Sequence, residues 1–511
     1  MTKPFILACT CLAALTACAT APGAPSAVSR NAGPLADDPW FALGQQTLAE
    51  RKAVRSIRGP AKNVILFVAD GMDPTTVAAA RIFDGQLKGG TGEENALSFE
   101  RFAHLAMSKT YTTDYQVPDS AGTMSAMVTG VKTKSGMLSL TDAAERGDCA
   151  SALAAAAPTL AEYAERAGLA VGVVSTAELT HATPGAVYAH VPERGWGSDA
   201  DMPAAAKAAG CVDIARQLIE FPYGDGLDIA LGGGRAHFLP LTASDPEDGG
   251  ETGEREDGRD LAAEWAAKSP DHVFVWNTAQ FEAASADAKI LGLFERGHLE
   301  FEADRAADTG GEPSLTEMTV AAIERLSRRD EGFFLVVEAG RVDHAHHGGN
   351  AYRALTDTIE FAEAIAAARA MTAVEDTLII ATADHGHTMA FQGYPKRGAS
   401  ILGLTGYDAA DGKGYATLAY ANGPGSVFFE EDLSAGRPPV DADAAALANY
   451  RQQALIPLRS ETHGGQDVTI HASGPNAYLF DGVVEQNYIF HVIEDALRLR
   501  ARAASAAPAA D

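Results

Sequence analysis

The sequence has little positive charge, few cysteines, no internal repeat and, beyond its first residues, no long apolar run. Its 511 residues include 40 Lys+Arg against 68 Asp+Glu, a formal net charge of −28. Nucleic acid needs a basic surface, so this balance excludes it as a specific partner, and an anionic substrate would need a locally positive site. The 46% hydrophobic content allows a large core and excludes a disordered chain. Without a further apolar run of about 18 residues, we expect no membrane-spanning helix in the body of the chain.

The first residues have the pattern of a bacterial lipoprotein signal. Lys3 is followed by an apolar stretch at 5–15 and then by small residues, which predicts a secretory signal over 1–17. Leu15-Thr16-Ala17-Cys18 matches a lipobox, whose cysteine is lipidated; an ordinary cleaved signal with an incidental cysteine is the alternative. Lipoproteins carry more than one acyl chain, as stable anchoring requires. We therefore predict a lipid-anchored protein of a bacterial cell envelope, facing the periplasm or the surface, and Ala19 in place of Asp favours the outer membrane.

Two cysteines lie beyond this segment. Cys9 and Cys11 leave with the signal, and Cys18 is assigned to the lipid. Cys149 and Cys211 remain as an even pair in an oxidising compartment, so they form either a disulfide or two buried free thiols.

The remaining chain divides into a tether, a folded body and a tail. Residues 18–39 are rich in Ala, Pro, Gly and Ser and predict a flexible tether, whereas 501–511 form an Ala-rich tail. The body, 40–500, opens with a helical pattern reaching about Arg58. Short β-branched apolar runs then alternate with helical stretches such as 160–167 and 352–370. The runs lie at 63–69, 170–175, 227–231, 272–276, 333–337 and 377–381.

This alternation predicts an α/β fold: a doubly wound, mostly parallel sheet with helices on both faces. Such sheets place their sites at the carboxyl ends of the strands. Residues 391–458 lack the strand–helix rhythm and predict an insertion.

Carboxylates and histidines follow three of the predicted strands. Asp70 follows the first run, Glu338 follows 333–337 with Asp343 and His347 close behind, and Asp384-His385 follow 377–381. A mixture of carboxylate and imidazole suits Zn²⁺, and its carboxylate-rich part suits Mg²⁺. A single residue of this kind is more often a helix cap or a solvated side chain, but three strand ends with the same feature predict a metal centre.

Ser120 stands just before an apolar helical stretch at 124–128. A helix N-terminus favours an anion, so Ser120 is a candidate nucleophile, and a plain helix cap is the alternative. The metal ligands elsewhere favour the nucleophile, since a serine beside a metal ion can be ionised without a histidine base.

Ordered blocks from about Trp40 to Arg498 resemble the alkaline phosphatases, and the animal type more than the enteric-bacterial type. The blocks include Val68-Ala69-Asp70-Gly71-Met72, Gln116-Val117-Pro118-Asp119-Ser120, His181-Ala182-Thr183-Pro184-Gly185, Ala189-His190-Val191-Pro192-Glu193-Arg194, Thr382-Ala383-Asp384-His385 and Glu461-Thr462-His463. The resemblance implies hydrolysis of phosphate monoesters through a phosphoserine at Ser120, with two zinc ions and one magnesium ion.

The resemblance also implies a role for each matching residue. The first zinc would be held by Asp343, His347 and His463, the second by Asp70, Asp384 and His385 with Ser120, and magnesium by Asp70, Thr183 and Glu338. Arg194 would clamp two phosphate oxygens, which suits the geometry of a guanidinium. Cys149 and Cys211 fall where the animal enzymes have a disulfide. The helix from Trp40 and the insertion 391–458 resemble the arm and the crown of a homodimer.

Four features carry alternatives. His181 replaces an Asp of the enteric type near the magnesium site and leaves the third metal in question. His344 replaces a Lys and would approach phosphate as a weaker cation, or else be a surface residue. Asp73 is interpreted as the cap of a helix whose first residue is Pro74. A calcium site of the animal type would use Glu247, the backbone oxygen of Phe294, Glu295 and Glu312, unless these residues only form an acidic loop.

Two other functions compete with a monoesterase. A phosphodiesterase or sulfatase of the same superfamily is less favoured, because Arg194 suits a monoester dianion and the sulfatase signature around Ser120 is absent. A non-catalytic surface lipoprotein that binds phosphate or metal is disfavoured because the core residues are all present.

Overall fold

The computed structural model describes residues 38–430, 433–434 and 436–506, and the chain divides into two compact units, 1–55 and 56–511. The predicted signal, Cys18, nearly all of the tether and the end of the tail lie outside the described residues. No helix within the described ranges combines the length and apolar character needed to cross a bilayer.

In the first unit, helix α1 (Pro39–Ala53) is capped by Asp38, whose carboxylate accepts from the Phe41 N–H at 2.9 Å. The predicted end near Arg58 is wrong, because the backbone turns extended at Val54. No residue of α1 is buried, so no packing offsets the low helix propensity of the β-branched residues that follow.

The second unit is built on one ten-stranded sheet, in the order β17-β2-β16-β8-β1-β7-β3-β4-β6-β5. Only β16 runs antiparallel to its neighbours, so the sheet is mostly parallel, as predicted. In chain order its strands are β1 (Asn63–Ala69), β2 (His104–Lys109), β3 (Ala170–Glu178), β4 (Ile229–Gly233), β5 (His272–Val275), β6 (Lys289–Leu293), β7 (Phe333–Ala339), β8 (Thr377–Ala383), β16 (Val468–Ser473) and β17 (Gly482–Glu485).

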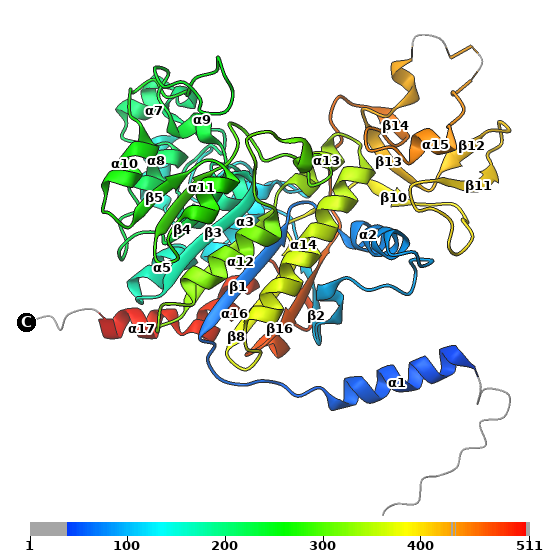
Figure 1. Cartoon of the computed structure of the whole chain (residues 1–511), viewed down its shortest axis with the longest axis horizontal. Coiled ribbons are helices and arrows are strands. Elements are labelled where there is room, and N and C mark those ends of the chain that lie inside the picture. Colours follow the sequence, from blue (N-terminus) through cyan, green and yellow to red (C-terminus); the bar gives the residue numbers. More distant parts are fainter. Residues whose placement is uncertain (1–37, 431–432, 435, 507–511) are drawn as a thin grey trace, which may run out of the picture. The chain divides into compact units, whose positions relative to one another are not determined.

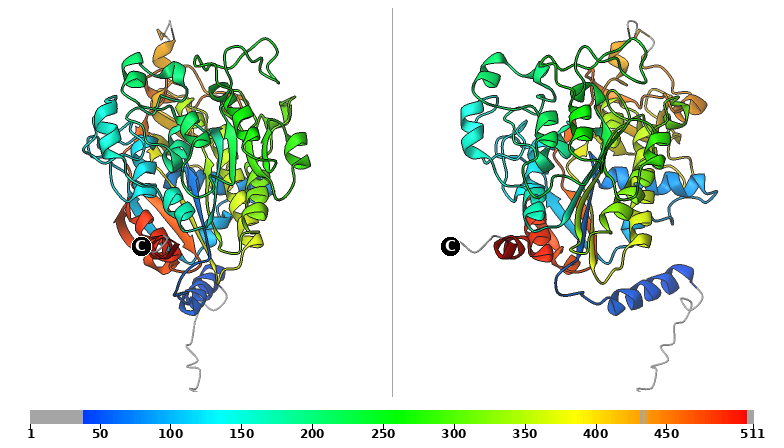
Figure 2. Two further views of the ribbon diagram at one scale, coloured as in Figure 1. Left: turned by 90° about the vertical axis from the view of Figure 1, so that its left-hand side faces the viewer. Right: turned by 60° about the vertical axis from the view of Figure 1, so that its left-hand side comes forward.

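Alternate side chains of the central strands enter two separate cores. In β1, Val64, Leu66 and Val68 face one core, whereas Ile65 and Phe67 face the other. Both faces are therefore covered by helices, as Figures 1 and 2 show. The first core is covered by α3 (Ser120–Thr129), α5 (Leu160–Arg166), α6 (Ala182–Tyr188), α8 (Ile214–Ile219), α10 (Leu261–Ala267) and α16 (Tyr488–Leu497). The second is covered by α2 (Pro74–Leu87), α11 (Thr278–Ala283), α12 (Leu315–Leu326) and α14 (Ala351–Met371).

The second unit has further α-helices. They are α4 (Cys149–Ala155), α7 (Ala204–Ala208), α9 (Arg235–Phe238), α13 (Arg341–His347), α15 (Ala442–Ala445) and α17 (Leu499–Ala506). A disulfide joins Cys149 to Cys211, so the alternative of two free thiols is wrong.

The segment 391–458 does not continue the strand–helix alternation, but it has regular structure of its own. Strands β10 (Met389–Phe391), β13 (Leu418–Gly423) and β14 (Ala454–Pro457) form a small sheet, and β11 (Leu404–Asp408) pairs with β12 (Gly414–Ala416). These elements gather beyond the central sheet (Figure 1, orange and yellow).

Candidate active site

The site lies where three adjacent strands end. β1 pairs with β8 on one side and β7 on the other, with Ala69 opposite both Ala383 and Ala339. Asp70, Glu338 and Asp384 consequently meet at the carboxyl ends of these strands, and all three are fully buried. Burial, together with the charges of Asp384, Asp343 and Glu338, raises the pKa of Asp70 well above its usual value. Burial also raises the pKa of Glu338 to about 8. Carboxyls buried this close together are ionised at neutral pH only beside compensating cations, and otherwise bind protons.

Ser120 points into this group from the first turn of α3. The helix is capped by Asp119, whose carboxylate accepts from the Gly122 N–H at 3.2 Å, so the interpretation of Ser120 as the cap is wrong. Its Oγ lies 3.2 Å from His385 Nε2 and 3.3 Å from an Asp70 oxygen. The same imidazole nitrogen is 3.2 Å from Asp384 Oδ2. Four potential ligands therefore converge, as predicted for one metal position.

A second group brings two imidazoles face to face. His347 Nδ1 donates to the Glu461 carbonyl at 2.5 Å, and His463 Nδ1 donates to the Pro118 carbonyl at 2.8 Å. Because carbonyls only accept, each ring in its neutral form presents an Nε2 lone pair, and these two atoms are 3.1 Å apart. Asp343 lies within 3.4 Å of both nitrogens. Two lone pairs and a carboxylate around one point repel each other without a cation, so this donor set fits a zinc ion.

A third group contains buried polar atoms that lack partners. Asp70, Glu338 and His181 each offer an atom within 4.8 Å of the others. Among the described residues, Thr183 Oγ1, Glu338 Oε1 and His181 Nδ1 are buried without a hydrogen-bond partner. Such orphaned oxygens beside fully buried carboxylates fit a hydrated Mg²⁺.

Arg194 borders the same space. Its Nη1 donates to Asp119 at 3.2 Å, and its Nη2 donates to His181 Nε2 at 3.0 Å. Because a guanidinium has no acceptor, this contact leaves the proton of neutral His181 on Nδ1, the atom without a partner. The guanidinium is thereby hydrogen-bonded both to Asp119, which precedes Ser120, and to His181 of the third group.

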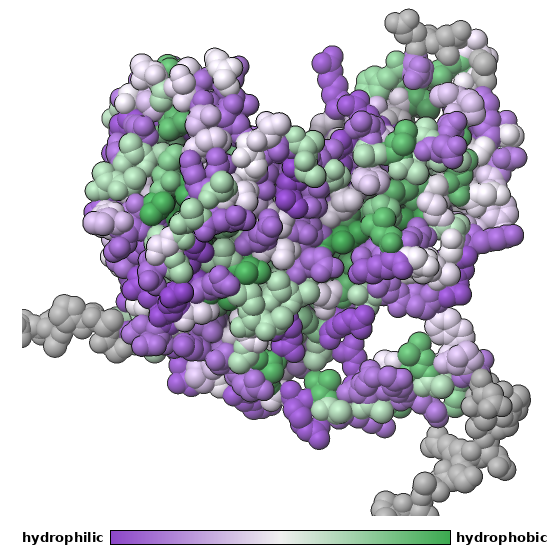
Figure 3. All heavy atoms as spheres, viewed as in Figure 1, coloured by the Kyte–Doolittle hydropathy of each residue, from purple (hydrophilic) through white to green (hydrophobic). Residues whose placement is uncertain are grey.

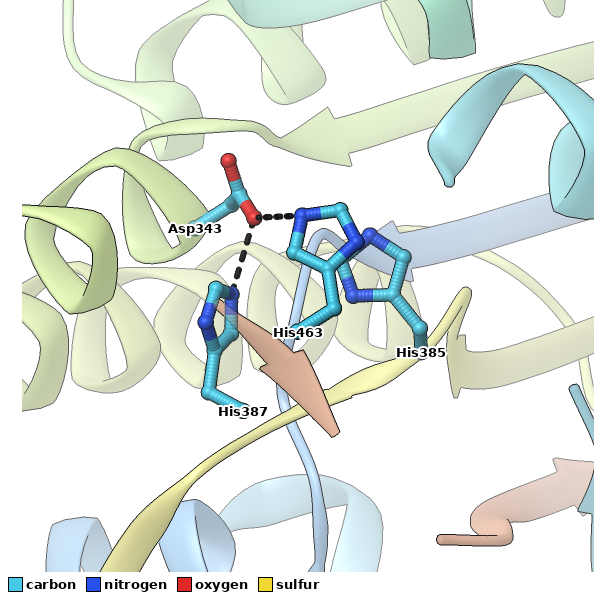
Figure 4. Close-up of side chains that lie close together, drawn as sticks. All are labelled: Asp343, His385, His387 and His463. Atoms are coloured by element: carbon cyan, nitrogen blue, oxygen red, sulfur yellow. Dashed lines mark hydrogen bonds and ion pairs between the residues drawn. The ribbon is translucent and has the colours of Figure 1, made fainter. Parts of the chain in front are cut away.

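Sequence reasoning did not assign His387 or Glu461. His387 donates to Asp343 at 2.8 Å and to Glu461 at 2.6 Å. Figure 4 shows the Asp343 carboxylate close to the rings of both His387 and His463. Although burial lowers it, these two hydrogen bonds raise the pKa of His387 to about 10, so the ring is a buried cation. Its position two residues after His385, on the short strand β9 (Gly386–His387), was the signal available in the sequence.

Gly71 makes room for this ring. Its φ is +74°, and a Cβ there would lie 2.4 Å from His387 Cδ2. Only glycine therefore fits between Asp70 and the His387 imidazole.

His344 differs from the expectation of a weak cation. Burial lowers its pKa to about 4, and the nearby Arg341 charge acts in the same direction. The Arg341 guanidinium donates to His344 Nδ1 at 3.1 Å. His344 is therefore a neutral hydrogen-bonding group in this structure and not a substitute for a lysine charge.

The remaining residues that the sequence singled out lie outside the three groups at the strand ends. Asp73 caps α2 and accepts from the Thr76 N–H at 2.8 Å, as predicted. In the acidic region, burial raises the pKa of Glu295 to about 8 and of Glu312 to about 9, with neighbouring carboxylates adding to both. Glu247 receives a hydrogen bond from Arg235 at 2.8 Å. Glu312 is buried, whereas Glu247 and Glu295 are half-buried, so a calcium site and an acidic loop both stay predictions.

Fold and site together define an α/β enzyme with buried groups of potential metal ligands at the strand ends. The family model for alkaline phosphatase matches residues 61–499, and the chain belongs to this family. It is 41% identical over 486 residues to the tissue-nonspecific alkaline phosphatase of Gallus gallus, with 92% of each chain covered. It is 42% identical over 464 residues to that of Rattus norvegicus, covering 89% of this chain and 87% of the relative.

Solved structures show the same fold. Thermus thermophilus alkaline phosphatase matches with a TM-score of 0.62 at 26% identity, covering 88% of this chain and 96% of the other. Alkaline phosphatase from the Antarctic bacterium TAB5 matches with a TM-score of 0.59 at 21% identity, covering 86% and 99%. The protein is thus a metal-dependent enzyme that hydrolyses phosphate monoesters.

Proposed function

We propose that hydrolysis proceeds through a phosphoserine at Ser120, with two zinc ions and one magnesium ion in the three groups described above. The observation that carries the proposal is the convergence of Ser120 Oγ, Asp70 and His385 within 3.4 Å of one another. Zinc would be held by Asp343, His347 and His463 and by Asp70, Asp384 and His385, and magnesium by Asp70, Thr183 and Glu338. When bound, these ions supply Lewis-acid stabilisation of charge on the attacking and leaving oxygens.

The residues of the chain position the phosphoryl group for two displacements. Arg194 offers two N–H groups to non-bridging oxygens, while the start of α3 directs backbone N–H groups toward the same anion. Ser120 Oγ forms a bond to phosphorus as the bond to the alcohol oxygen breaks, and the serine proton is passed on to that oxygen. Water then attacks phosphorus, releases phosphate and returns a proton to Ser120. Catalysis is thus mainly positioning and charge stabilisation.

Replacing the nucleophile tests this mechanism. Ser120→Ala should lower kcat for an aryl phosphate monoester by more than about 10³-fold, and chelation should abolish activity of the unchanged enzyme. Ser125→Ala is a matched control, since Ser125 is buried on the same helix but donates to the Met137 carbonyl. Metal analysis of the purified protein should find zinc and magnesium near two and one per chain.

The same assay separates the other two functions. A higher rate with the diester of the same phenol would favour a phosphodiesterase. Absence of turnover with retained phosphate binding would favour a binding lipoprotein. A rate that survives chelation or the loss of Ser120 would contradict the proposed mechanism.

We further propose that a homodimer forms through α1 and the 391–458 segment. Without burying any residue, α1 exposes Trp40, Phe41, Leu43 and Leu48. The small sheets expose further apolar side chains, and Figure 3 shows hydrophobic atoms gathered over them. Tyr394 and Leu455 are 84% and 68% exposed. Light scattering should give twice the monomer mass, and Tyr394→Asp with Leu455→Asp should lower it, unlike Leu241→Asp at another exposed site.

Two expectations remain proposals. A lipid on Cys18 is supported by the lipobox sequence, and Cys18→Ser should move the protein from the membrane fraction to the soluble one. Calcium binding by Glu247, the Phe294 carbonyl, Glu295 and Glu312 is supported by the raised pKa of all three carboxyls, which burial causes. Added Ca²⁺ should raise the Tm of the unchanged protein more than that of Glu295→Gln.

A further inference from the structure

His344 has one ring nitrogen held by a fixed donor. Arg341 Nη1 lies 3.1 Å from His344 Nδ1. A guanidinium has five N–H donors and no acceptor, so His344 Nδ1 must accept this hydrogen bond. In the neutral ring the hydrogen is therefore on Nε2. A neutral imidazole can adopt either tautomer, and this single contact selects between them.

Arg341 also has contacts with residues other than His344, and these fix the position of its side chain and backbone. Its guanidinium stacks over the Phe301 ring, with 3.8 Å from its carbon to the ring centroid. Its charge interacts with the carboxylates of Asp357, on α14, and of Glu300, Glu312 and Asp304. Its backbone N–H donates to Thr176 Oγ1 at 3.2 Å, which fixes the start of α13. The donor that reaches His344 is thus placed by contacts outside the metal centre.

Two further imidazoles confine the His344 ring. The His298 ring lies 4.2 Å away, centroid to centroid, and His298 Nδ1 accepts from the Glu178 N–H at 3.0 Å. The His181 ring lies 5.4 Å away in an edge contact, and His181 is bonded to Arg194. His344 thus lies next to the residue pair that borders the phosphate position. Within the described part of the chain, its Nε2 has no hydrogen-bond partner.

We propose that Arg341 is a positioning residue that holds His344 as a neutral Nε2–H donor toward the phosphoryl oxygens of substrate and product. This inference rests on the proposed function. The His344 Nε2–H group would give phosphate one more hydrogen bond besides those from Arg194. It would do so without adding a positive charge to the site. In the other tautomer an Nε2 lone pair would face an oxyanion, which is repulsive. Removing Arg341 should therefore weaken phosphate binding by way of His344.

A double-mutant cycle tests the proposal. Arg341→Met keeps an unbranched apolar stem of the arginine type but ends before the guanidinium carbon, so it removes the donors together with the stacking on Phe301. We expect it to raise the inhibition constant of inorganic phosphate about five- to tenfold and to raise KM similarly, with a smaller change in kcat. His344→Ala should have a similar effect, and adding Arg341→Met to His344→Ala should change nothing further. Arg341→Lys, which keeps one donor, should recover part of the affinity.

The matched control is Arg353→Met, because Arg353 also lies over Phe301 but pairs with Asp304. Arg353→Met should leave the inhibition constant of phosphate unchanged. The comparison uses variants whose metal content and Tm equal those of the unchanged enzyme. An unchanged inhibition constant in Arg341→Met would overturn the proposal. So would an equal loss from Arg341→Met with and without His344. Failure of the proposed function is distinct: the unchanged enzyme would then show no chelation-sensitive monoester turnover.

Discussion

The side chains proposed to bind metal are oriented by a second layer of contacts. The Glu461 carbonyl and the Pro118 carbonyl accept from His347 and His463, and each contact turns an Nε2 lone pair toward Asp343. His387 in turn holds Asp343 by one oxygen. The Glu461 side chain completes this layer, accepting from His387 as well as from the Thr388 N–H at 2.7 Å. Such partners tune metal affinity without touching the metal.

Glu461→Gln should therefore weaken zinc retention. The substitution removes the anion that, with Asp343, keeps His387 protonated, so Asp343 loses a charge-assisted partner. We expect the free zinc concentration for half-maximal activity to rise about 10- to 100-fold, while kcat at saturating zinc stays near that of the unchanged enzyme. Activity measured in zinc-buffered solutions gives both quantities. Glu220→Gln, in a surface ion-pair network, serves as the control, and identical zinc curves for the two variants would contradict the role of Glu461.

At the scale of elements, continuous apolar strands were predictable because parallel strands are buried on both faces. All six predicted runs lie in the central sheet, and the first matches β1 residue for residue. The strands β2, β6, β16 and β17 were not predicted. Thr469 and His471 interrupt the apolar pattern of β16, and β17 is a four-residue edge strand. Short or mixed strands form through pairing with neighbours, which a local pattern does not contain.

The site was predictable where a residue follows a recognisable strand, and not where tertiary contact defines it. Asp70 and Asp384-His385 were found because their strands were found. Asp119 was overlooked as the α3 cap because Ser120 beside it is also a common capping residue. The neutral state of His344 depends on its burial and on Arg341, which the sequence places nearby but does not orient.

The disulfide is an element-scale stabiliser that links α4 to the segment after α7. It spans 62 residues, so the chain-entropy relation gives about 4 kcal/mol of stabilisation. The double variant Cys149→Ser, Cys211→Ser should lose up to this amount in the free energy of unfolding, measured with denaturant. Reductant should shift the unchanged protein toward the variant and leave the variant unaffected. Equal sensitivity of both proteins to reductant would show that the effect arises elsewhere.

At the scale of the whole molecule, buried carboxyl groups have different surroundings at the two ends of the central sheet. At the carboxyl end, proposed cations compensate Asp70, Glu338 and Asp384. At the amino end, Glu165 on α5 is 4% exposed and lies near Asp225 and Asp228. Its Oε1 has no hydrogen-bond partner among the described residues. Burial, with the charge of Asp228, raises the pKa of Glu165 to about 9, so the net charge of −28 counts a carboxyl that stays neutral below that pH.

The Glu165 carboxyl should make the free energy of unfolding fall as pH rises. Between pH 4.5, where the unfolded carboxyl ionises, and about 9, the folded state binds more protons than the unfolded state. The slope is at most about 1.4 kcal/mol per pH unit over that window. Glu165→Gln keeps the shape and removes the titration, so it should raise the free energy of unfolding at pH 9 relative to the unchanged protein and not at pH 4.5.

Denaturant unfolding at both pH values, on protein stripped of metal, measures this difference. Glu324→Gln on the exposed face of α12 is the control and should behave alike at both. If Glu165→Gln changed stability equally at the two pH values, the buried carboxyl would not be the titrating group. The expected result would mean that the amino end of the sheet limits stability under alkaline conditions, independently of the metal centre at the other end.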